Sequence, residues 1–377
     1  MRILHLSNHC HEIGNGIMNV AVDVACRQVA QGHTVAMASA GGSYVRLLAE
    51  NGVGHFQLRQ TWQAPWTLPR SALRLHALIR TWKPDVVHAH MMTGALLGRG
   101  VRFGAAWRLV TTVHNEWQPS AVLMGVGDRV IAVSAAVATR MAARRVAPGK
   151  IDVVRNGPLN SPRRLPGDGA VASLTHPAIL TVAGLYLRKG IADLIAAFGT
   201  LAERHPTATL YVVGDGPDRA TFEAQARAAG LGGRIHFTGF LADPRPYFRG
   251  ADIFVLASLS EPFGLVVAEA REMGCAVVAS DVGGIPEVLE DGRAGLLVPP
   301  GNPAALGRTL AGLLDDPSTL IRWQAAARRG LDWLDVGRVA EETVQVYQRA
   351  IDFHRWRGQL PLARRNAAVP HVDASVD

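Results

Sequence analysis

The stretch SEPFGLVVAEA, residues Ser260 to Ala270, sets the expected fold of the C-terminal half of this chain. Two carboxylates, Glu261 and Glu269, stand eight residues apart, with Pro262, Gly264 and a small apolar run between them. Pro262 suits the start of a helix, because proline lacks a backbone donor that would go unused there. The pattern predicts a helix that begins just after Gly264, with Glu261 in the preceding loop and Glu269 about one turn inside.

The start of this helix is expected to bind an anion. The first N–H groups of a helix have no partner within it, and the helix dipole favours negative charge there. Gly264 lets the backbone approach a ligand closely, and the two glutamates add acceptors at different depths. This combination suits a nucleotide sugar, with the diphosphate at the helix start and hydroxyl groups on the carboxylates. The alternative is an amphipathic helix that carries two solvated glutamates.

The composition indicates a globular protein of two domains. The chain has 377 residues, of which 48% are hydrophobic and 19% charged. Three scattered cysteines are too few for a disulfide framework, so a reducing, cytoplasmic compartment is expected. The N-terminal MRILHLSNHC indicates a strand and not a signal peptide. No run of about 18 apolar residues is present, so no membrane-spanning segment is expected.

The net charge of +8 points to anionic partners. No RNA-binding or helix-turn-helix signature is present, so phosphate-bearing substrates or an anionic membrane face are favoured over nucleic acid. Residues Trp62 to Trp82 carry aromatic and basic side chains on an expected amphipathic helix that begins near Leu68. Such a helix can bind a membrane interface, although it more often packs on its own sheet with solvated arginines.

The N-terminal half opens as a doubly wound α/β domain. A buried strand at Arg2 to Leu6, a glycine-bearing loop, a helix over Ile17 to Gln31 and a strand at Thr34 to Ala38 follow in order. Gly14 and Gly16 form a short glycine motif that could equally be an ordinary tight turn. The same loop holds His9, Cys10, His11 and Glu12, whose spacing does not match a helical zinc pair, so hydrogen-bond donors are favoured over a metal site.

Histidines follow two expected strands of this half. His88 and His90 end the strand Pro84 to Ala89, and His114 follows the strand Leu109 to Val113. Open α/β sheets bind ligands at the carboxyl ends of their strands. This position favours a functional role for His114 over a structural one, and to a lesser degree for the other two.

The C-terminal half begins a second α/β series at Ala178. Its first strand leads into GLYLRKG, Gly184 to Gly190, and then into a helix from about Ile191. Gly184 permits close approach of a ligand, Arg188 can bind phosphate through two hydrogen bonds, and Lys189 adds a point charge. These residues predict a phosphate site.

The chain resembles the retaining glycosyltransferases of the GT-B fold, family 4, also called group 1 glycosyl transferases. The resemblance rests on the two glutamates of SEPFGLVVAEA, the Gly184 to Gly190 segment, the TVHNEW run around His114 and the turn near Gly283. It extends over nearly the whole chain, to about Phe353. It implies an α/β fold of two Rossmann-like domains that face a central cleft.

The expected domains follow from this resemblance. They comprise an acceptor domain at 1–160, a linker at 161–176, a nucleotide-sugar domain at 177–339, and a closing helix with a basic tail at 340–377. The closing helix is expected to return to the first domain.

The resemblance also assigns roles to residues. Arg188 and Lys189 are expected to neutralise the donor diphosphate, Glu261 to bind hydroxyls of the donor sugar, and His114 to contact that sugar; these four are the expected catalytic residues. The expected donor-binding residues are Gly14, Gly16, Gly184, Phe240, Leu241, Phe263, Gly264, Leu265, Val266 and Glu269. Glu269 is expected to bind the ribose, and the backbone near Phe240 to contact the base, with burial in the core as the alternative for Phe240.

The resemblance implies retaining transfer of a hexose or N-acetylhexosamine from a nucleotide-diphosphate sugar, UDP- or GDP-linked, to a glycan or lipid-linked acceptor. No cofactor and no metal are expected, because cationic side chains and a helix start do the work of a metal. Cell-surface polysaccharide or lipopolysaccharide synthesis at the inner face of the membrane is the expected setting. The alternatives are a nucleotide-sugar 2-epimerase of the same fold and a non-catalytic nucleotide-sugar-binding subunit.

Overall fold

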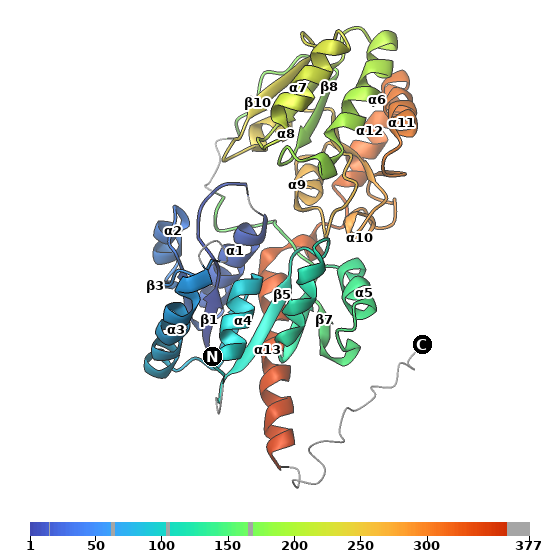
Figure 1. The fold of residues 1–377 in the computed structure, drawn as a ribbon. Coiled ribbons are helices and arrows are strands. Elements are labelled where there is room, and N and C mark those ends of the chain that lie inside the picture. The colour runs from blue at the N-terminus through green and yellow to red at the C-terminus, as the bar shows by residue number, and fades with distance from the viewer. Residues whose placement is uncertain (15, 62–64, 103–105, 165–168, 360–377) are drawn as a thin grey trace, which may run out of the picture. The chain divides into compact units, whose positions relative to one another are not determined.

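The computed structural model describes residues 1–14, 16–61, 65–102, 106–164 and 169–359, which form two compact units (Figure 1). The first unit comprises Met1–Glu12, Ile17–Arg155 and the chain from Gly337 onward. The second comprises Ile13–Gly16 and Asn156–Val336. Each unit contains one parallel sheet with helices packed on it, as the two-domain α/β expectation requires.

The sheet of the first unit has seven strands in the order β3-β2-β1-β4-β5-β6-β7. Every neighbouring pair is parallel, and the central strands are buried along nearly their whole length, which is typical of a sheet covered on both faces. The strands are β1 (Arg2–Leu6), β2 (Thr34–Ser39), β3 (Gly54–Gln57), β4 (Val86–Ala89), β5 (Arg108–Val113), β6 (Arg129–Ala132) and β7 (Ile151–Val153).

Helices follow most strands of the first unit. The α-helices are α1 (Gly16–Ala30), α2 (Tyr44–Glu50), α3 (Leu68–Trp82), α4 (Met92–Gly100), α5 (Ala135–Ala143) and α13 (Val336–Gln359). Short 3-10 segments are η1 (Pro65–Thr67), η2 (Pro119–Val126) and η3 (Pro148–Lys150). Ser134 caps α5 by accepting a hydrogen bond from the backbone N–H of Val137, as its sequence position predicts.

The sheet of the second unit has six parallel strands in the order β10-β9-β8-β11-β12-β13. Its apolar core fills the space between the sheet and its helices, with Phe198 and Phe222 among the fully buried side chains. The strands are β8 (Ala178–Val182), β9 (Thr209–Val213), β10 (Ile235–Gly239), β11 (Ile253–Leu256), β12 (Ala276–Ser280) and β13 (Leu296–Val298).

The second unit also alternates strands with helices. Its helices are α6 (Ile191–Arg204), α7 (Arg219–Ala228), α8 (Arg245–Gly250), α9 (Leu265–Met273), α10 (Ile285–Val288), α11 (Pro303–Asp315) and α12 (Pro317–Ala327), with 3-10 segments η4 (Leu187–Lys189) and η5 (Asp332–Leu334). Among the described residues, no helix is both long enough and apolar enough to cross a bilayer.

The strand orders create a switch point in each sheet. In the first, the chain leaves β1 for β2 on one side and returns to β4 on the other; in the second, β9 and β11 flank β8 in the same way. Loops that leave neighbouring strands at a switch point diverge, which opens a place for a ligand at the carboxyl ends of the strands. The switch points lie beside the loops after β1 and β4 and the loops after β8 and β11.

The helix expected after SEPFGLVVAEA is confirmed as α9, with Glu261 in the loop before it and Glu269 one turn inside. Pro262 precedes the helix by three positions. The chain first turns at Gly264, whose φ of 101° lies in the left-handed region, and Leu265 is the first helical residue. The turn separates Pro262 from the helix and leaves it buried in the loop.

The helix α13 is longer than expected: it starts at Val336, four residues before Ala340, and continues to Gln359. From Gly337 onward it belongs to the first unit, as expected for a closing helix. Several sequence expectations lie outside the described residues: the aromatic Trp62, the linker positions 165–168 and the basic tail around Arg364 and Arg365.

Arg271 anchors α9, the helix that carries Glu269. Its guanidinium is fully buried and donates to the carbonyl oxygens of Val288 and Ala327 and to a carboxylate oxygen of Glu290, 2.7 Å away. A charge buried at this depth is tolerated only because hydrogen bonds satisfy it. This one side chain therefore joins α9 to the C-terminal ends of α10 and α12.

We expect Arg271→Leu to lower the free energy of unfolding of the second unit by about 3–5 kcal/mol, because it leaves buried carbonyls and Glu290 without their partner. Arg293 approaches the same Glu290 from an exposed position, 76% accessible, so Arg293→Leu is the matched control and should cost less than about 0.5 kcal/mol. Urea unfolding of both variants measures the difference. Equal effects would contradict the anchoring role of Arg271.

Candidate functional site

The phosphate site expected at Gly184 to Gly190 is held against the loop after β11. The backbone N–H of Leu259 donates to the carbonyl of Arg188 at 2.8 Å. Gly190 has a φ of 65°, and a Cβ there would lie 1.9 Å from the carbonyl oxygen of Ala257. Only glycine permits this approach. The loops after β8 and β11, on either side of the second switch point, therefore pack directly against each other.

Lys189 and Glu261 form an ion pair between these two loops. The Lys189 Nζ lies 2.5 Å from Glu261 Oε2, and the Ser258 hydroxyl donates to the same oxygen at 3.4 Å. Both charged side chains are largely buried, at 17% and 11% accessibility. The lysine expected to bind phosphate thus contacts the glutamate expected to bind sugar.

The turn after β12 closes this arrangement from the other side. The N–H of Gly284 donates to the backbone carbonyl of Glu261 at 3.1 Å, and a Cβ on Gly283 would lie 1.7 Å from that same oxygen. The expected sugar-side turn therefore touches the backbone of Glu261 directly. The loops after β8 and β12 thus hold Glu261, the first through its carboxylate and the second through its backbone.

Arg188 is oriented by an aromatic ring. Its guanidinium carbon lies 4.5 Å from the centroid of the Tyr186 ring, at a distance where cation–π attraction operates. The backbone N–H of Leu187 donates to the Asp218 carboxylate at 2.8 Å, which holds η4 in place. The two cations of the predicted phosphate site leave η4 with different partners: Lys189 contacts Glu261, and Arg188 stacks on Tyr186.

Glu269 lies apart from that ion pair. Its Oε1 is 3.6 Å from Arg164, which also forms an ion pair with Glu272 one turn along α9. The two glutamates of SEPFGLVVAEA therefore have different cationic partners, Lys189 for Glu261 and Arg164 for Glu269. Sequence reasoning did not single out Arg164, because it lies in the segment expected to be a linker.

The other expected donor-binding residues lie in several environments. Phe240 follows β10 and is 44% exposed, so the alternative that it fills the core is wrong. Phe263 is buried and meets Trp333 edge-on at 6.3 Å between ring centroids. Leu241, Leu265 and Val266 are partly exposed, the last two in the first turn of α9.

The loop after β1 holds the remaining expected residues. Gly14 lies in this loop, and Gly16 is the first residue of α1. Cys10 is buried, with its Sγ 3.1 Å from the Ser39 hydroxyl, and burial raises the pKa of its thiol. The rings of His9 and His11 lie 5.5 Å apart, centroid to centroid.

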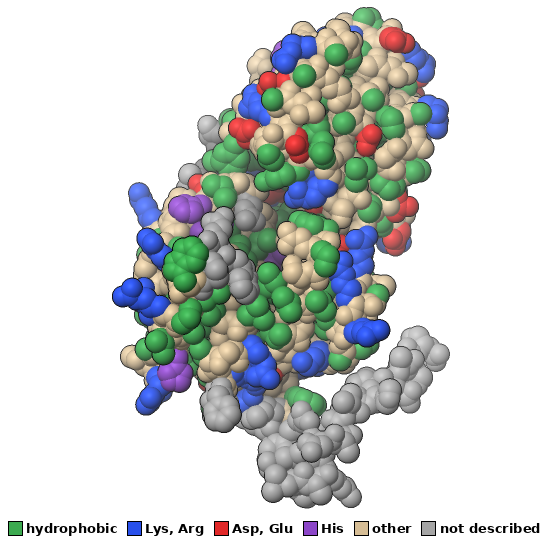
Figure 2. Space-filling model, in the orientation of Figure 1, with side chains coloured by type: hydrophobic (Ala, Val, Ile, Leu, Met, Phe, Trp, Pro, Cys, Tyr) green, Lys and Arg blue, Asp and Glu red, His purple; other side chains and the backbone are tan. Residues whose placement is uncertain are grey.

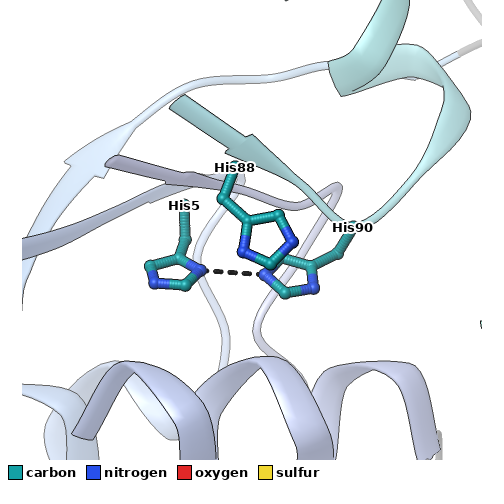
Figure 3. Close-up of side chains that lie close together, drawn as sticks. All are labelled: His5, His88 and His90. Carbon is teal, nitrogen blue, oxygen red and sulfur yellow. Dashed lines mark hydrogen bonds between the residues drawn. The ribbon is translucent and has the colours of Figure 1, made fainter. Parts of the chain in front are cut away.

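Four histidines gather at the switch point of the first sheet. His5 on β1 is in register with His88 on β4, and His90 follows two residues later, so all three rings project toward one face of the sheet (Figure 3). His5 and His90 are joined by a 2.9 Å hydrogen bond, and His90 contacts His114 at 3.1 Å. The histidines expected from the sequence, His88, His90 and His114, are thus brought together, and His5 joins them.

Two helices complete this histidine cluster. The Gln28 side chain on α1 contacts His5 at 2.8 Å, and the Tyr347 hydroxyl on α13 contacts His88 at 2.6 Å. Sequence reasoning missed His5, Gln28 and Tyr347. The signal for His5 was its position on the first strand, level with the strand that ends in His88 and His90; no pattern marked the other two.

Burial keeps the cluster neutral near pH 7. Loss of hydration lowers the pKa of His5 to about 4 and that of His114 to about 3. The pKa values of His88 and His90 lie well below the usual 6.5, because burial is reinforced by neighbouring imidazoles. Burial also raises the pKa of the Tyr347 phenol far above its ordinary value.

His5, His88 and His90 could also be considered as ligands of a metal ion, since one nitrogen from each lies within 4.8 Å of the others. Zinc would require about 2.0–2.1 Å from each nitrogen to the metal. Both ring nitrogens of His5, His88 and His90 contact a side chain within hydrogen-bond distance. The arrangement therefore fits a hydrogen-bonded network better than an ion.

Lowering the pH should reduce the stability of the first unit, because protonation of these histidines favours the unfolded chain. The folded-state pKa of His5 lies below its unfolded value, so the unfolded chain binds the proton first. The stabilisation is complete above about pH 6.5 and is lost as the pH falls toward 4; His5 alone accounts for about 2 kcal/mol between pH 8 and pH 5.

Hydrogen exchange measured by mass spectrometry at pH 8, 6.5 and 5, corrected for intrinsic rates, tests this expectation. Protection should fall in peptides that contain β1 and β4 more than in peptides from β8 and β11. His76→Gln, at an exposed position on α3, is the control and should behave like the unmodified chain. An equal loss in both units would contradict the role of the cluster.

Comparison with known proteins agrees with this arrangement. A family model described as Glycosyl transferases group 1 matches residues 171–330, and one described as Glycosyltransferase Family 4 matches residues 14–157. A glycogen synthase of Mycobacterium tuberculosis is 33% identical over 323 residues, with 76% of this chain and 75% of that protein covered. A 2-deoxystreptamine N-acetyl-D-glucosaminyltransferase of Streptomyces fradiae is 31% identical, with 79% and 76% covered.

Solved structures share the fold. HepE of Anabaena in complex with UDP superposes with a TM-score of 0.76 at 21% identity, over 93% of this chain and all of that one. Sucrose-phosphate synthase of Thermosynechococcus elongatus gives 0.77 at 21% identity, over 94% and 100%. With two parallel-sheet units, matches to both family models and relatives of this identity, the chain belongs to the family 4, or group 1, glycosyltransferases of the GT-B fold.

Proposed function

We propose that this glycosyltransferase transfers a hexose or N-acetylhexosamine from a nucleotide-diphosphate sugar, with retention of configuration, to a glycan or lipid-linked acceptor. The observation that carries the proposal is the Lys189–Glu261 pair beside Arg188 at the start of α9. The relative HepE was solved with UDP, which supports a UDP-linked donor. Family relatives include a lipopolysaccharide core glycosyltransferase of Rhizobium meliloti, which supports a role in cell-surface polysaccharide synthesis.

The donor diphosphate would bind Arg188 and Lys189. When phosphate arrives, Lys189 can exchange its contact with Glu261 for one with a phosphate oxygen, and the freed carboxylate can accept hydrogen bonds from sugar hydroxyls. The backbone N–H groups at the start of α9 add further donors. In this proposal, the ion pair holds both side chains where the donor would bind.

The transfer itself would depend on charge stabilisation and positioning. The diphosphate leaves with the bonding electrons of the glycosidic bond, while the acceptor hydroxyl approaches the same face of an oxocarbenium-like sugar. Arg188 and Lys189 offset the negative charge on the leaving group, which supports transfer without a divalent metal. His114 would accept a hydrogen bond from a sugar hydroxyl, and its neutral ring would not repel the positive charge developing on the sugar.

A donor panel followed by stereochemical analysis tests this function. Binding to the folded state raises stability, so one among UDP-, GDP- and ADP-sugars should raise the melting temperature. Proton NMR of the product should then show the anomeric configuration of the donor, and activity should persist in EDTA. Arg188→Ala should lower turnover about a hundredfold or more, since a lost stabilising donor costs about 2.7–4 kcal/mol.

Three results would contradict all or part of the proposal. Conversion of UDP-N-acetylglucosamine without any acceptor would indicate the 2-epimerase alternative, and donor binding without turnover on any acceptor would indicate a binding subunit. Loss of activity in EDTA that magnesium or manganese restores would contradict the metal-free part. The transferase is favoured over these alternatives because the relatives at 31–33% identity are named as an N-acetyl-D-glucosaminyltransferase and a glycogen synthase, and both family models are of glycosyltransferases.

Substitutions of Glu261 and Glu269 should weaken the binding of different ligands. Glu269→Gln should weaken binding of the bare nucleoside diphosphate by about 1.5–3 kcal/mol, because a charge-assisted bond to the ribose is lost. Glu261→Gln should leave that binding equal or tighter, because Lys189 is released from its ion pair, but should weaken the intact donor. Glu272→Gln is the matched control, since Glu272 shares Arg164 with Glu269.

Isothermal titration of the diphosphate and of the donor that the panel selects measures all three variants. If Glu269→Gln and Glu261→Gln weaken the bare diphosphate equally, the division of roles between ribose and sugar is wrong. If Glu272→Gln matches Glu269→Gln, the effect comes from Arg164 and not from a bond to the ribose.

A membrane contact is proposed for the face around η1 and α3. Trp66 and Leu73 are 76% and 72% exposed there, and Arg70, Arg74 and Arg80 are exposed beside them. Figure 2 shows basic and hydrophobic side chains interspersed over α3. Exposed apolar side chains interspersed with arginines suit an anionic bilayer, where a lipid-linked acceptor would lie.

Vesicle flotation tests this contact. The chain should float with anionic vesicles and less with neutral ones, and Arg70→Glu/Arg74→Glu should reduce flotation, since each basic residue near the surface contributes about 1 kcal/mol. Arg227→Glu/Arg308→Glu, at exposed positions of the second unit, is a control of identical net charge. Equal losses in both double variants would mean that only the overall charge matters.

A further inference from the structure

We propose that Gln28, His5 and His90 form a one-directional hydrogen-bond relay that holds His114 in its Nε2–H tautomer and leaves its Nδ1 as a hydrogen-bond acceptor. His114 lies after β5 at the carboxyl edge of the first sheet, whereas Gln28 lies on α1. The relay residues are therefore positioning residues. They determine which nitrogen of His114 carries the proton, although only His90 contacts that ring. The relay itself does not depend on the proposed function.

The relay is continuous. Gln28 Oε1 lies 2.8 Å from His5 Nε2, His5 Nδ1 lies 2.9 Å from His90 Nε2, and His90 Nδ1 lies 3.1 Å from His114 Nε2. Gln28, His5 and His90 are at most 3% exposed, so water does not compete for these bonds. His114 alone is partly exposed.

The direction of the relay follows from the inventory of donors. A neutral imidazole has one N–H donor and one acceptor nitrogen, and an amide oxygen can only accept. The Gln28 oxygen therefore requires a proton on His5 Nε2, which makes His5 Nδ1 an acceptor and requires a proton on His90 Nε2. The same step repeated at His90 places the proton of His114 on Nε2.

Tyr347 on α13 fixes the orientation of the Gln28 amide. The Tyr347 hydroxyl lies 2.6 Å from His88 Nδ1 and 3.3 Å from Gln28 Nε2. Hydroxyl groups form shorter hydrogen bonds than N–H groups. The donor–acceptor distance is typically 2.5–3.0 Å for an O–H donor and 2.7–3.2 Å for an N–H donor. The short bond therefore suits donation from Tyr347 to His88, and the long one suits donation from the Gln28 amide to Tyr347.

The His88 bonds agree with this direction. With Nδ1 accepting from Tyr347, His88 carries its proton on Nε2 and donates it to the Thr112 hydroxyl, 2.7 Å away. A rotated Gln28 amide would reverse every bond, from Tyr347 through His114, and would turn His114 Nδ1 into a donor. The two directions thus predict opposite protonation of His114, which a measurement can distinguish.

The expected consequence rests on the proposed function. An acceptor nitrogen on His114 selects for a substrate hydroxyl that donates, and it disfavours a carbonyl or phosphate oxygen at that point. Because Tyr347 belongs to α13, the helix that closes the chain, this property of His114 depends on a residue 233 positions later.

Nitrogen-15 NMR of the full chain, labelled at histidine, measures the tautomers directly without substrate. Protonated and bare ring nitrogens give well-separated shifts, and couplings to the ring protons distinguish Nδ1 from Nε2. At pH 7.5, His5, His90 and His114 should each show a protonated Nε2 and a bare Nδ1. Exposed His76 provides the reference for a ring that is free to exchange between both forms.

Variants remove the start of the relay. Gln28→Leu and, independently, Tyr347→Phe should shift His114 toward the mixture of forms seen for His76, although neither residue touches His114. Gln31→Leu makes the same chemical change one turn further on, where the side chain donates to the Gly337 carbonyl, and should leave His114 unchanged. Assigning the His114 signal requires only His114→Gln.

Three outcomes would overturn the relay. These are a protonated Nδ1 on His114 in the unmodified chain, a His114 tautomer that resists both Gln28→Leu and Tyr347→Phe, and ring shifts that change on dialysis against a chelator, which would indicate a bound metal. If Gln28→Leu does not fold, the unmodified spectrum and Tyr347→Phe still decide. A failed transfer assay with the expected spectrum would refute the proposed function and leave the relay intact.

Discussion

The contact between Lys189 and Glu261 is the interaction on which the second unit's site depends. Two opposite charges, both largely withdrawn from water, are stable only when paired, and the pair joins the loop after β8 to the loop after β11. The backbone bond from Leu259 to Arg188 and the glycine at 190 allow those loops to meet. The ion pair therefore fixes these two loops of the candidate site relative to each other.

The first unit also buries polar side chains at its switch point, but these side chains are uncharged. Its switch point between β1 and β4 contains imidazoles that burial keeps neutral, and both ring nitrogens of His5, His88 and His90 contact neighbouring side chains. Buried polar networks of this kind specify a unique arrangement when every member is bonded. The switch point of one unit therefore carries a paired cation and carboxylate, and that of the other carries neutral, hydrogen-bonded imidazoles.

Sequence patterns predicted the elements well where one local rule acted alone. The start of α9 followed from Gly264 and the apolar run, and α3 began at Leu68 as its periodicity indicated. Expectations failed where a tertiary contact intervened. Arg164, in an expected linker, forms ion pairs with Glu269 and Glu272, and Phe240 is exposed where burial in the core was the alternative.

The sequence by itself determined the family, the two α/β series and the residue types of the site, because strand, glycine loop and helix are adjacent in the chain and their chemistry is local. Only the tertiary structure decided which partners these residues have. Lys189 and Glu261 are 72 positions apart and His88 and Tyr347 are 259 apart, and no local pattern encodes such a pairing. Strand order brings these groups together, since parallel neighbours align their carboxyl ends whatever their separation in sequence.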